Sequence, residues 1–181
     1  MSSLSPCGDL LVTVTVFSDS HGRAERIEEM MERVTACSQK PSAVLFLGDG
    51  LSDLDRADML MGYPLTAVRG NCDMFRAEDV PAERVIMLGG YRILMLHGHT
   101  VGVKHGMVQA LAAAVRENAD ILLFGHTHEP YAETFSAGRV YMGVTFSKTL
   151  HVMNPGSLAE GYFGSLSLGN NGVIMSHGEL F

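Results

Sequence analysis

Three short apolar runs in the first half of the chain constrain its fold more than any other feature. They are Leu10–Phe17 (LLVTVTVF), Ala43–Leu47 (AVLFL) and Leu65–Val68. Runs of this length and composition that continue directly into polar loops are typical of buried strands. Residues 23–38 carry apolar side chains at helical spacing, and a second, short helix is expected over Ser52–Met61, with Ser52 as its N-cap. Strands that alternate with helices predict a parallel sheet with helices on its faces.

The second half of the chain predicts hairpins as well as strands. Two apolar runs flank Gly89-Gly90, and a last hairpin is expected to turn at residues 169–172, because such pairs of small residues favour tight turns. A helix is expected over Met107–Arg116. The further strands expected are Arg84–Leu88, Tyr91–Leu96, Ile121–Phe124, Ala132–Phe135, Val140–Val144 and His151–Asn154. Two packed mixed sheets with helices outside would hold this many strands, as a single domain over 10–181 after a flexible tail at 1–9.

The composition narrows the classes of protein. The chain has 181 residues, 46% of them hydrophobic and 18% charged, which is an ordinary balance for one globular domain. Its net charge of −7 argues against a nucleic-acid binder, whose footprint would be a basic patch. The three cysteines are too few for a disulfide framework, and residues 1–9 lack the basic region of a signal peptide. We therefore expect a cytoplasmic protein that does not bind membranes.

A polar motif follows each of five predicted strands. The motifs are Asp19-Ser20-His21, Gly48-Asp49-Gly50, Gly70-Asn71-Cys72-Asp73, His97-Gly98-His99 and Gly125-His126-Thr127-His128. Taken singly, most of them fit an ordinary turn or a surface histidine. The last is the most specific, because two imidazoles that flank one residue after a buried strand are hard to explain as structure.

Together, the motifs indicate a metal site. Ligands of open α/β sheets bind outside the carboxyl ends of the strands, so the five loops should converge. They would supply two carboxylates, one amide and three or four imidazoles, and such a cluster would be mutually unsatisfied without cations. Mixed nitrogen and oxygen donors fit two divalent ions such as Mn²⁺, Fe²⁺ or Zn²⁺.

In this order the motifs resemble those of the calcineurin-like metallophosphoesterase superfamily. The small bacterial and archaeal phosphodiesterase branch is the most similar, because it has GNCD, HGH and a late NPGS segment, here Asn154-Pro155-Gly156-Ser157. The resemblance implies a four-layer α-β-β-α sandwich with two central mixed sheets. It also implies two divalent ions per chain, with manganese expected and iron, zinc, nickel or cobalt as alternatives. One ion would be held by Asp19, His21, Asp49 and His128, and the second by Asp49, Asn71, His97 and His126.

The resemblance further implies hydrolysis of a small phosphodiester by a hydroxide that bridges the two ions, with Asp49 as the shared carboxylate. Many larger members have a histidine directly after the GN pair, where this chain has Cys72. A thiol is a poor general acid, so we expect activity on esters with acidic leaving groups. His99 is the remaining candidate for a catalytic role, and Asn71, Cys72 and His99 are expected to contact the substrate.

Two other functions fit the same motifs. A phosphomonoesterase or a nucleotide pyrophosphatase would use the same ligands, since the variable loops around the site choose the substrate. A non-catalytic scaffold that resembles the retromer subunit of this fold is the second alternative, although that subunit lacks part of the histidine set. Relatives also suggest a homo-oligomer, either a dimer or a tetramer.

Overall fold

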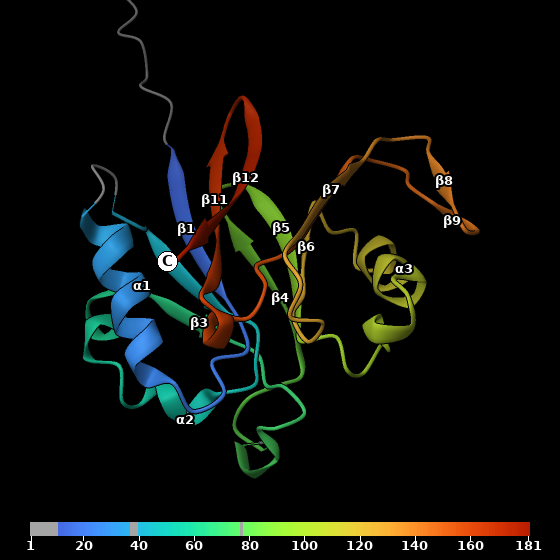
Figure 1. Cartoon of the computed structure of the whole chain (residues 1–181). Coiled ribbons are helices and arrows are strands. Elements are labelled where there is room, and N and C mark those ends of the chain that lie inside the picture. The colour runs from blue at the N-terminus through green and yellow to red at the C-terminus, as the bar shows by residue number, and fades with distance from the viewer. Residues whose placement is uncertain (1–10, 37–39, 77) are drawn as a thin grey trace, which may run out of the picture.

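Two five-stranded sheets face each other at the centre of the protein (Figure 1). The computed structural model describes residues 11–36, 40–76 and 78–181. The tail predicted at 1–9 lies outside the described residues. The chain runs through the first sheet, crosses to the second and returns to the first for its last hairpin. Strands of the first sheet therefore come both before and after those of the second sheet in the sequence.

The first sheet combines three parallel strands with a terminal hairpin. Its strands are β1 (Val12–Phe17), β2 (Ala43–Phe46), β3 (Leu65–Ala67), β11 (Tyr162–Gly169) and β12 (Gly172–Glu179). Their order is β12-β11-β1-β2-β3, with β1, β2 and β3 parallel and β11 antiparallel to β1. Gly169 pairs with Gly172 across the turn, so the hairpin predicted there is confirmed.

The second sheet is also mixed. Its strands are β4 (Glu83–Leu88), β5 (Tyr91–Leu96), β6 (Ile121–Leu123), β7 (Tyr131–Phe135) and β10 (Leu150–Asn154). The order is β4-β5-β6-β10-β7, in which β5, β6 and β10 are parallel and the two edge strands are antiparallel to their neighbours. The hairpin predicted around Gly89-Gly90 is confirmed, because Leu88 pairs with Tyr91.

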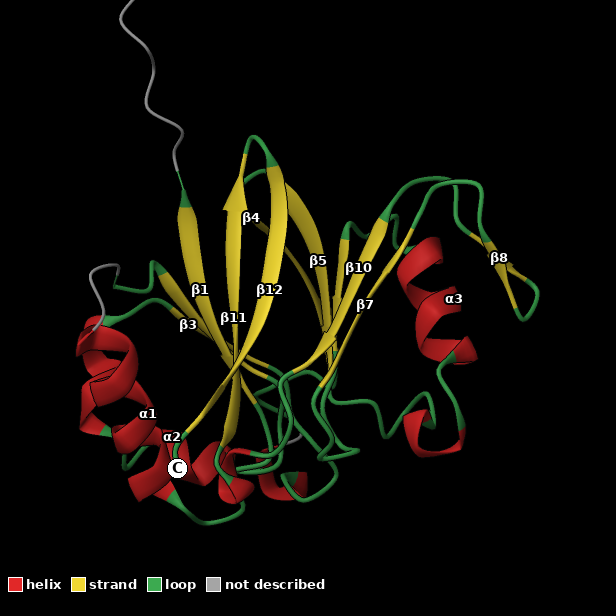
Figure 2. Cartoon of the chain, turned by 45° about the horizontal axis from the view of Figure 1, so that its top comes forward, coloured by secondary structure: helices red, strands yellow, loops and turns green. Residues whose placement is uncertain are grey.

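Helices cover the outer faces of both sheets (Figure 2). α1 (Ala24–Ala36) and α2 (Leu51–Leu54) lie outside the first sheet, and α3 (Val108–Arg116) lies outside the second. Short 3₁₀ turns are η1 (Asp58–Gly62), η2 (Met74–Arg76), η3 (Val103–His105) and η4 (Leu158–Glu160). The longest described helix has 13 residues, and none of those in the described ranges is long and apolar enough to cross a membrane.

Alternating side chains fill three separate apolar layers. On β2, Val44 and Phe46 pack toward α1, whereas Leu45 lies between the two sheets. On β6, Ile121 also lies between the sheets, and Leu122 packs toward α3. Because successive strand residues point to opposite faces, strands buried on both faces appear in the sequence as continuous apolar runs. The four-layer α-β-β-α sandwich is confirmed.

The predicted helix over Ser52–Met61 is wrong. The structure has the short helix α2 followed by the 3₁₀ turn η1, and the N-cap of α2 is Gly50 rather than Ser52. The side chain of Asp53 explains the break, since it accepts hydrogen bonds from Ser20 Oγ (2.6 Å) and from the Gly22 amide (2.8 Å). Anchored in this way to the loop after β1, the segment continues in 3₁₀ turns instead of a regular helix.

The single strand predicted over Val140–Val144 is wrong as well. This segment is a small hairpin of β8 (Val140–Tyr141) and β9 (Val144–Thr145), which extends away from the body of the molecule (Figure 1). The turn residues Met142 and Gly143 both have positive φ, of 45° and 86°. Two consecutive residues in this region form the tight turn that suits a two-residue hairpin.

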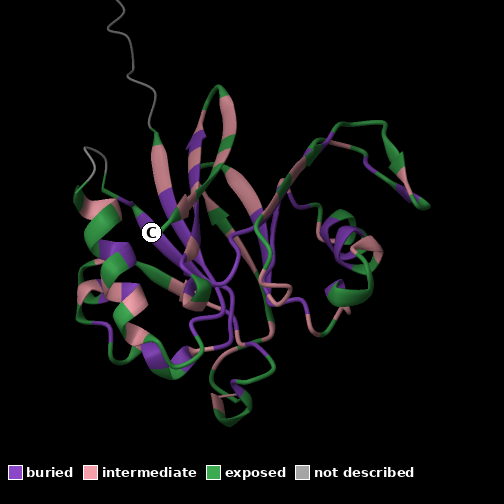
Figure 3. Ribbon diagram, viewed as in Figure 1, coloured by how far each residue is buried: buried purple, intermediate pink, exposed green. Residues whose placement is uncertain are grey.

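One end of the two sheets carries all five polar motifs. The carboxyl ends of β1, β2, β3, β5 and β6 lie at the lower edge in Figure 1, and each continues into one motif. Much of these loops is buried, as are the central strands above them (Figure 3). Buried polar loops at a common sheet edge are where ligands of α/β proteins bind.

Candidate metal centre

The converging loops bring six of the seven predicted ligands together. Three groups of side chains have ligand atoms within 4.8 Å of one another: Asp19, His21 and His128; Asp49, His97 and His126; and His21, Asp49 and Cys72. The first two groups correspond to the two ion sites implied by the resemblance. Asp49 also belongs to the third group together with His21, so this carboxylate lies between the two sites, as expected of a shared ligand.

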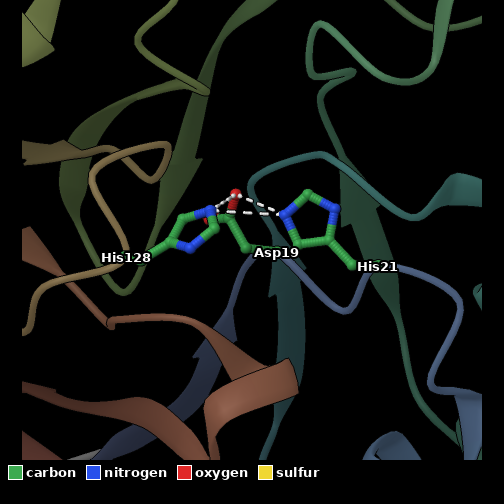
Figure 4. A group of neighbouring side chains, drawn as sticks. All are labelled: Asp19, His21 and His128. Carbon is green, nitrogen blue, oxygen red and sulfur yellow. Dashed lines mark hydrogen bonds and ion pairs between the residues drawn. The ribbon is translucent and has the colours of Figure 1, made fainter.

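The first group has the spacing of ligands around one cation (Figure 4). Asp19 Oδ1 lies 3.3 Å from His128 Nε2 and 3.6 Å from His21 Nε2, and the two imidazole nitrogens are 3.3 Å apart. Ligands held about 2.1 Å from a common ion at ordinary angles would be roughly 3.0–3.4 Å apart. Asp19 Oδ1 is buried and accepts no hydrogen bond in the described structure. A bound cation would satisfy it, so the residues fit a metal.

The second group is built around His97, which is completely buried. Its Nε2 lies 3.3 Å from Asp49 Oδ2 and 3.1 Å from His126 Nδ1, and its Nδ1 lies 2.8 Å from the carbonyl oxygen of Leu47. A ring nitrogen that donates to a backbone carbonyl leaves the other nitrogen to bind a metal. The orientation of His97 therefore presents Nε2 to Asp49 and His126.

Asp49 and His97 shift each other's pKa in opposite directions. Burial raises the pKa of the Asp49 carboxyl, but the hydrogen bond and charge of His97 outweigh this effect and hold the pKa well below its usual range. Burial lowers the pKa of His97, yet the carboxylates of Asp49 and Asp19 raise it further than burial lowers it. Burial, followed by the charges of His97 and Lys104, lowers the pKa of His126 to about 4. Two carboxylates and a neutral imidazole are a donor set that suits a divalent first-row metal ion.

Backbone strain is concentrated at the predicted ligands. Five of them have positive φ although they are not glycine: Asp19 (56°), His21 (46°), Asp49 (62°), His126 (69°) and His128 (66°). Among the described residues only Asn118 and Met142 share this property. Such a conformation costs about 1–3 kcal/mol and persists only where the surroundings enforce it, commonly at functional sites. The surroundings that enforce it here are two sets of hydrogen bonds.

The first set comes from Asp73, which is buried in the loop after β3. One carboxylate oxygen accepts from the amides of Asp49 (2.7 Å) and Gly70 (2.9 Å). The other accepts from the amides of Gly50 and Leu51, both at 2.9 Å. Gly70 is needed for this close packing, because a Cβ there would lie 2.0 Å from Asp49 Oδ1. Asp73 thus ties the second motif to the third.

The second set comes from the segment after β10. Asn154 Nδ2 donates to the carbonyl of Gly125 (3.1 Å) and to Thr127 Oγ1 (2.8 Å). The Ser157 hydroxyl donates to the carbonyl of Asp19 (3.1 Å), and the Ser157 amide donates to the carbonyl of His128 (3.2 Å). The late NPGS segment therefore holds the first and the last motif together.

Asn71 and Cys72 follow in the loop after Gly70, and both are exposed. Asn71 Nδ2 donates to Cys72 Sγ over 3.3 Å. The role of the Asn71 amide oxygen as a metal ligand stays a prediction. Cys72 lies within reach of His21 and Asp49, beside the predicted ligands, although the sequence did not indicate that its sulfur could join a ligand group. Partial desolvation, followed by the hydrogen bond and charge of Asp49, raises the pKa of the Cys72 thiol to about 11. The thiol is thus an even weaker acid than its ordinary pKa implies.

His99 and Arg69 lie on the His97 side of the centre. The ring of His99 is 5.5 Å from the ring of His97 and 6.3 Å from that of His126, measured between centroids. Burial, then the charges of His97 and Arg69, lowers the pKa of His99. His99 Nδ1 and Arg69 Nε are both buried and have no hydrogen-bond partner within the described part of the chain. Sequence reasoning missed Arg69; its position directly before Gly70-Asn71 in an acidic chain was the available signal.

The chain belongs to the calcineurin-like phosphoesterase superfamily, whose domain model matches residues 12–176. A curated relative is the probable metallophosphoesterase YsnB of Bacillus subtilis, which is 32% identical over 117 residues. The matched part covers 65% of this chain and 64% of the length of the Bacillus protein. Membership of a phosphoesterase family agrees with the donor set found at the sheet edge.

Solved structures share the fold over nearly the whole chain. A predicted phosphoesterase from Streptococcus pneumoniae is 25% identical, with a TM-score of 0.61, and the match covers 93% of this chain and 98% of that one. A protein described as a novel archaeal phosphodiesterase is 19% identical, with a TM-score of 0.64 and coverages of 92% and 99%. Vacuolar protein sorting 29 from Cryptosporidium parvum has the same identity and TM-score, with coverages of 93% and 98%. At 19% identity the last two likenesses show the fold alone.

Proposed function

We propose that the protein is a metal-dependent phosphodiesterase that hydrolyses a small phosphodiester with two divalent ions, manganese being the expected metal. The observation that carries the proposal is the buried, unpartnered Asp19 Oδ1 with His128 and His21 nitrogens 3.3 and 3.6 Å away. Asp49 links this group to the second one. The family supports phosphoester hydrolysis, and the diester preference is inferred from Cys72, which stands where many larger members have a histidine.

Seven residues of the chain would bind the two ions. Asp19, His21 and His128 would hold one ion, His97, His126 and Asn71 the other, and Asp49 would bind both. When bound, the ions would neutralise charge on the phosphoryl oxygens and lower the pKa of a water molecule at the centre. His97 is held by the Leu47 carbonyl, and the Asp49 amide by Asp73, so neither needs to rearrange when substrate arrives. Preorganised groups of this kind are the main source of electrostatic catalysis.

The unpartnered nitrogens of His99 and Arg69 would contact the phosphoryl group. Hydrogen bonds from a guanidinium to a phosphate oxygen are among the strong ones, so an unpaired buried Nε suits an anionic substrate. We expect Arg69→Ala to lower kcat/KM roughly tenfold to hundredfold, the loss of one charge-assisted hydrogen bond. Steady-state kinetics on bis(p-nitrophenyl) phosphate, with metal content measured in parallel, checks this.

Arg84→Ala is the matched control, because Arg84 is an exposed arginine on β4 and its loss changes the net charge equally. Arg69→Lys keeps the charge but not the planar donors, and it should recover only part of the activity. Equal losses in the Arg69→Ala and Arg84→Ala variants would exclude a specific contact. A loss of bound metal in Arg69→Ala would instead place the residue among the supports of the metal centre.

The function itself is tested by comparing a diester with a monoester. We expect the manganese-loaded protein to hydrolyse bis(p-nitrophenyl) phosphate faster than p-nitrophenyl phosphate, and a chelator to abolish both reactions. Faster turnover of the monoester would favour the phosphomonoesterase alternative. No turnover with any divalent metal would overturn the enzyme proposal and leave the scaffold alternative. The fold shared with vacuolar protein sorting 29 is compatible with that alternative.

The location, the size of the substrate and the oligomeric state of the protein are proposed as well. We propose that the protein acts in the cytoplasm on a small soluble diester rather than on a nucleic acid, since the net charge of −7 would repel a polyanion. A dimer or tetramer is proposed from the family alone. Light scattering at several protein concentrations measures the mass in solution directly.

A further inference from the structure

A cavity of about 230 Å³ opens beside the metal centre, on the side of His21 and Asp49. It is smaller than the roughly 300–1,000 Å³ of pockets that enclose a whole drug-sized ligand. Cys72 and Phe75 also line it. Because His21 and Asp49 belong to the metal centre as well, a substrate bound at the centre would extend one of its groups into this cavity.

Phe75 forms an apolar wall of the cavity. It belongs to η2, and 69% of its surface is exposed although phenylalanine is usually buried. Its neighbours on both sides hold it in place. Asp73 is fixed by four backbone amides, and the guanidinium of Arg76 pairs with Asp55 (3.1 Å) and Asp79 (3.5 Å). A large apolar ring is thus presented to solvent from an anchored turn.

The described residues that line the cavity offer no lysine or arginine to a second anionic group. Apart from His21, its ionisable residues are the two carboxylates Asp49 and Asp73 and the thiol of Cys72, and no lysine or arginine of the described chain lines it. With His21 and Asp49 engaged by the proposed ions and Asp73 by four backbone amides, an anion placed there would find no cationic side chain of its own among the described residues. This lining favours an uncharged group in the part of the substrate that enters the cavity.

We propose that Phe75 binds a flat aromatic group of the substrate, an aryl ring or a nucleobase, by stacking, while the phosphoryl group lies at the metal centre. Aromatic rings gain more from an offset or edge contact with a phenyl ring than their buried area alone provides. The inference rests on the proposed phosphodiesterase function and adds to it the chemical class of the ester group. The aromatic ester group would lie beside Phe75, and the phosphoryl group would lie at the metal centre near Arg69.

Direct binding tests this without turnover. Calorimetry on the manganese-loaded protein would compare phenylphosphonate with methylphosphonate. These compounds share the phosphonate and differ in having a phenyl or a methyl group on phosphorus. We expect the wild-type protein to prefer the phenyl compound, and Phe75→Ala to reduce that preference roughly fivefold to tenfold. A second pair, adenosine 5′-monophosphate and ribose 5-phosphate, measures whether a nucleobase gains as much as an aryl ring.

Met74→Ala is the matched control, because Met74 is 67% exposed in the same turn but does not line the cavity. It should leave both preferences unchanged, and Phe75→Tyr should retain them. An unchanged preference in Phe75→Ala, or an equal loss in both alanine variants, would overturn the inference while hydrolysis of bis(p-nitrophenyl) phosphate continued. Failure of every phosphonate to bind, together with absence of turnover, would overturn the proposed function and this inference with it.

Discussion

Replacement of Asp49 by asparagine is expected to lower kcat/KM for bis(p-nitrophenyl) phosphate by more than about 100-fold, the upper end of the cost of losing a group that merely supports a metal ligand. Asp49 is the carboxylate common to two of the three ligand groups. Its Oδ2 faces His97 Nε2 at 3.3 Å, and its Oδ1 accepts the Cys72 amide at 2.7 Å. An amide of the same shape removes the negative charge that two cations would share.

Metal content distinguishes this loss from a general defect. Asp49→Asn should bind less than the two equivalents of manganese proposed for the wild-type chain, as measured by elemental analysis after gel filtration. Asp58→Asn is the control, because Asp58 is an exposed aspartate in η1 and its replacement changes the charge equally. If Asp49→Asn kept more than about a tenth of the wild-type activity, the carboxylate would not be a shared ligand and the proposed centre would be wrong.

Asp73→Asn should produce the largest loss of stability, about 3–5 kcal/mol in the free energy of unfolding. The buried Asp73 carboxylate accepts four backbone amides, which come from Asp49, Gly50, Leu51 and Gly70. An asparagine offers one acceptor oxygen and turns an amino group toward the remaining donors. Each buried donor left without a partner costs about 1–3 kcal/mol. Urea denaturation of the metal-free protein measures the change directly.

Asp79→Asn gives the corresponding surface control. The side chain of Asp79 is 71% exposed and forms an ion pair with Arg76 Nε at 3.5 Å, so its loss should change stability by less than about 1 kcal/mol. A fall of under about 1 kcal/mol in Asp73→Asn as well would mean that other contacts hold the loop. In that case the hydrogen bonds to Asp73 would not be what fixes the position of Asp49.

The residues of the candidate metal centre were predictable because they follow the strands directly. A strand such as Val12–Phe17 is apolar on both faces, so its end can be located in the sequence, and the parallel order of β1, β2 and β3 then places the following loops at one edge. The same logic placed His97 and His126 after β5 and β6. Convergence of the five loops was expected because ligands bind outside the carboxyl ends of strands, and the resemblance agreed with the two packed sheets and assigned each ligand to an ion.

What sequence reasoning missed depends on contacts between distant residues. The helix predicted from Ser52 ends early because Asp53 binds Ser20 and Gly22, more than 30 positions away. Arg69 and Phe75 lie in or beside the loop after β3, where no periodic pattern indicates which way a side chain points. Their importance becomes visible only when Arg69 Nε is found without a partner and Phe75 is found beside the cavity.

The late segment that holds the first and last motifs has a consequence for synthesis of the protein. The amides of Leu158 and Ala159 donate to the carbonyls of Ser18 (2.9 Å) and Asp19 (3.1 Å), and Ser157 holds His128. The strained backbones of Asp19 and His128 therefore lack these supports until the ribosome has released the region around residue 159. A chain is made from its N-terminus and a preformed metal site rarely exists before folding, so the ligand geometry first becomes available to cations after this late segment has joined the folded domain.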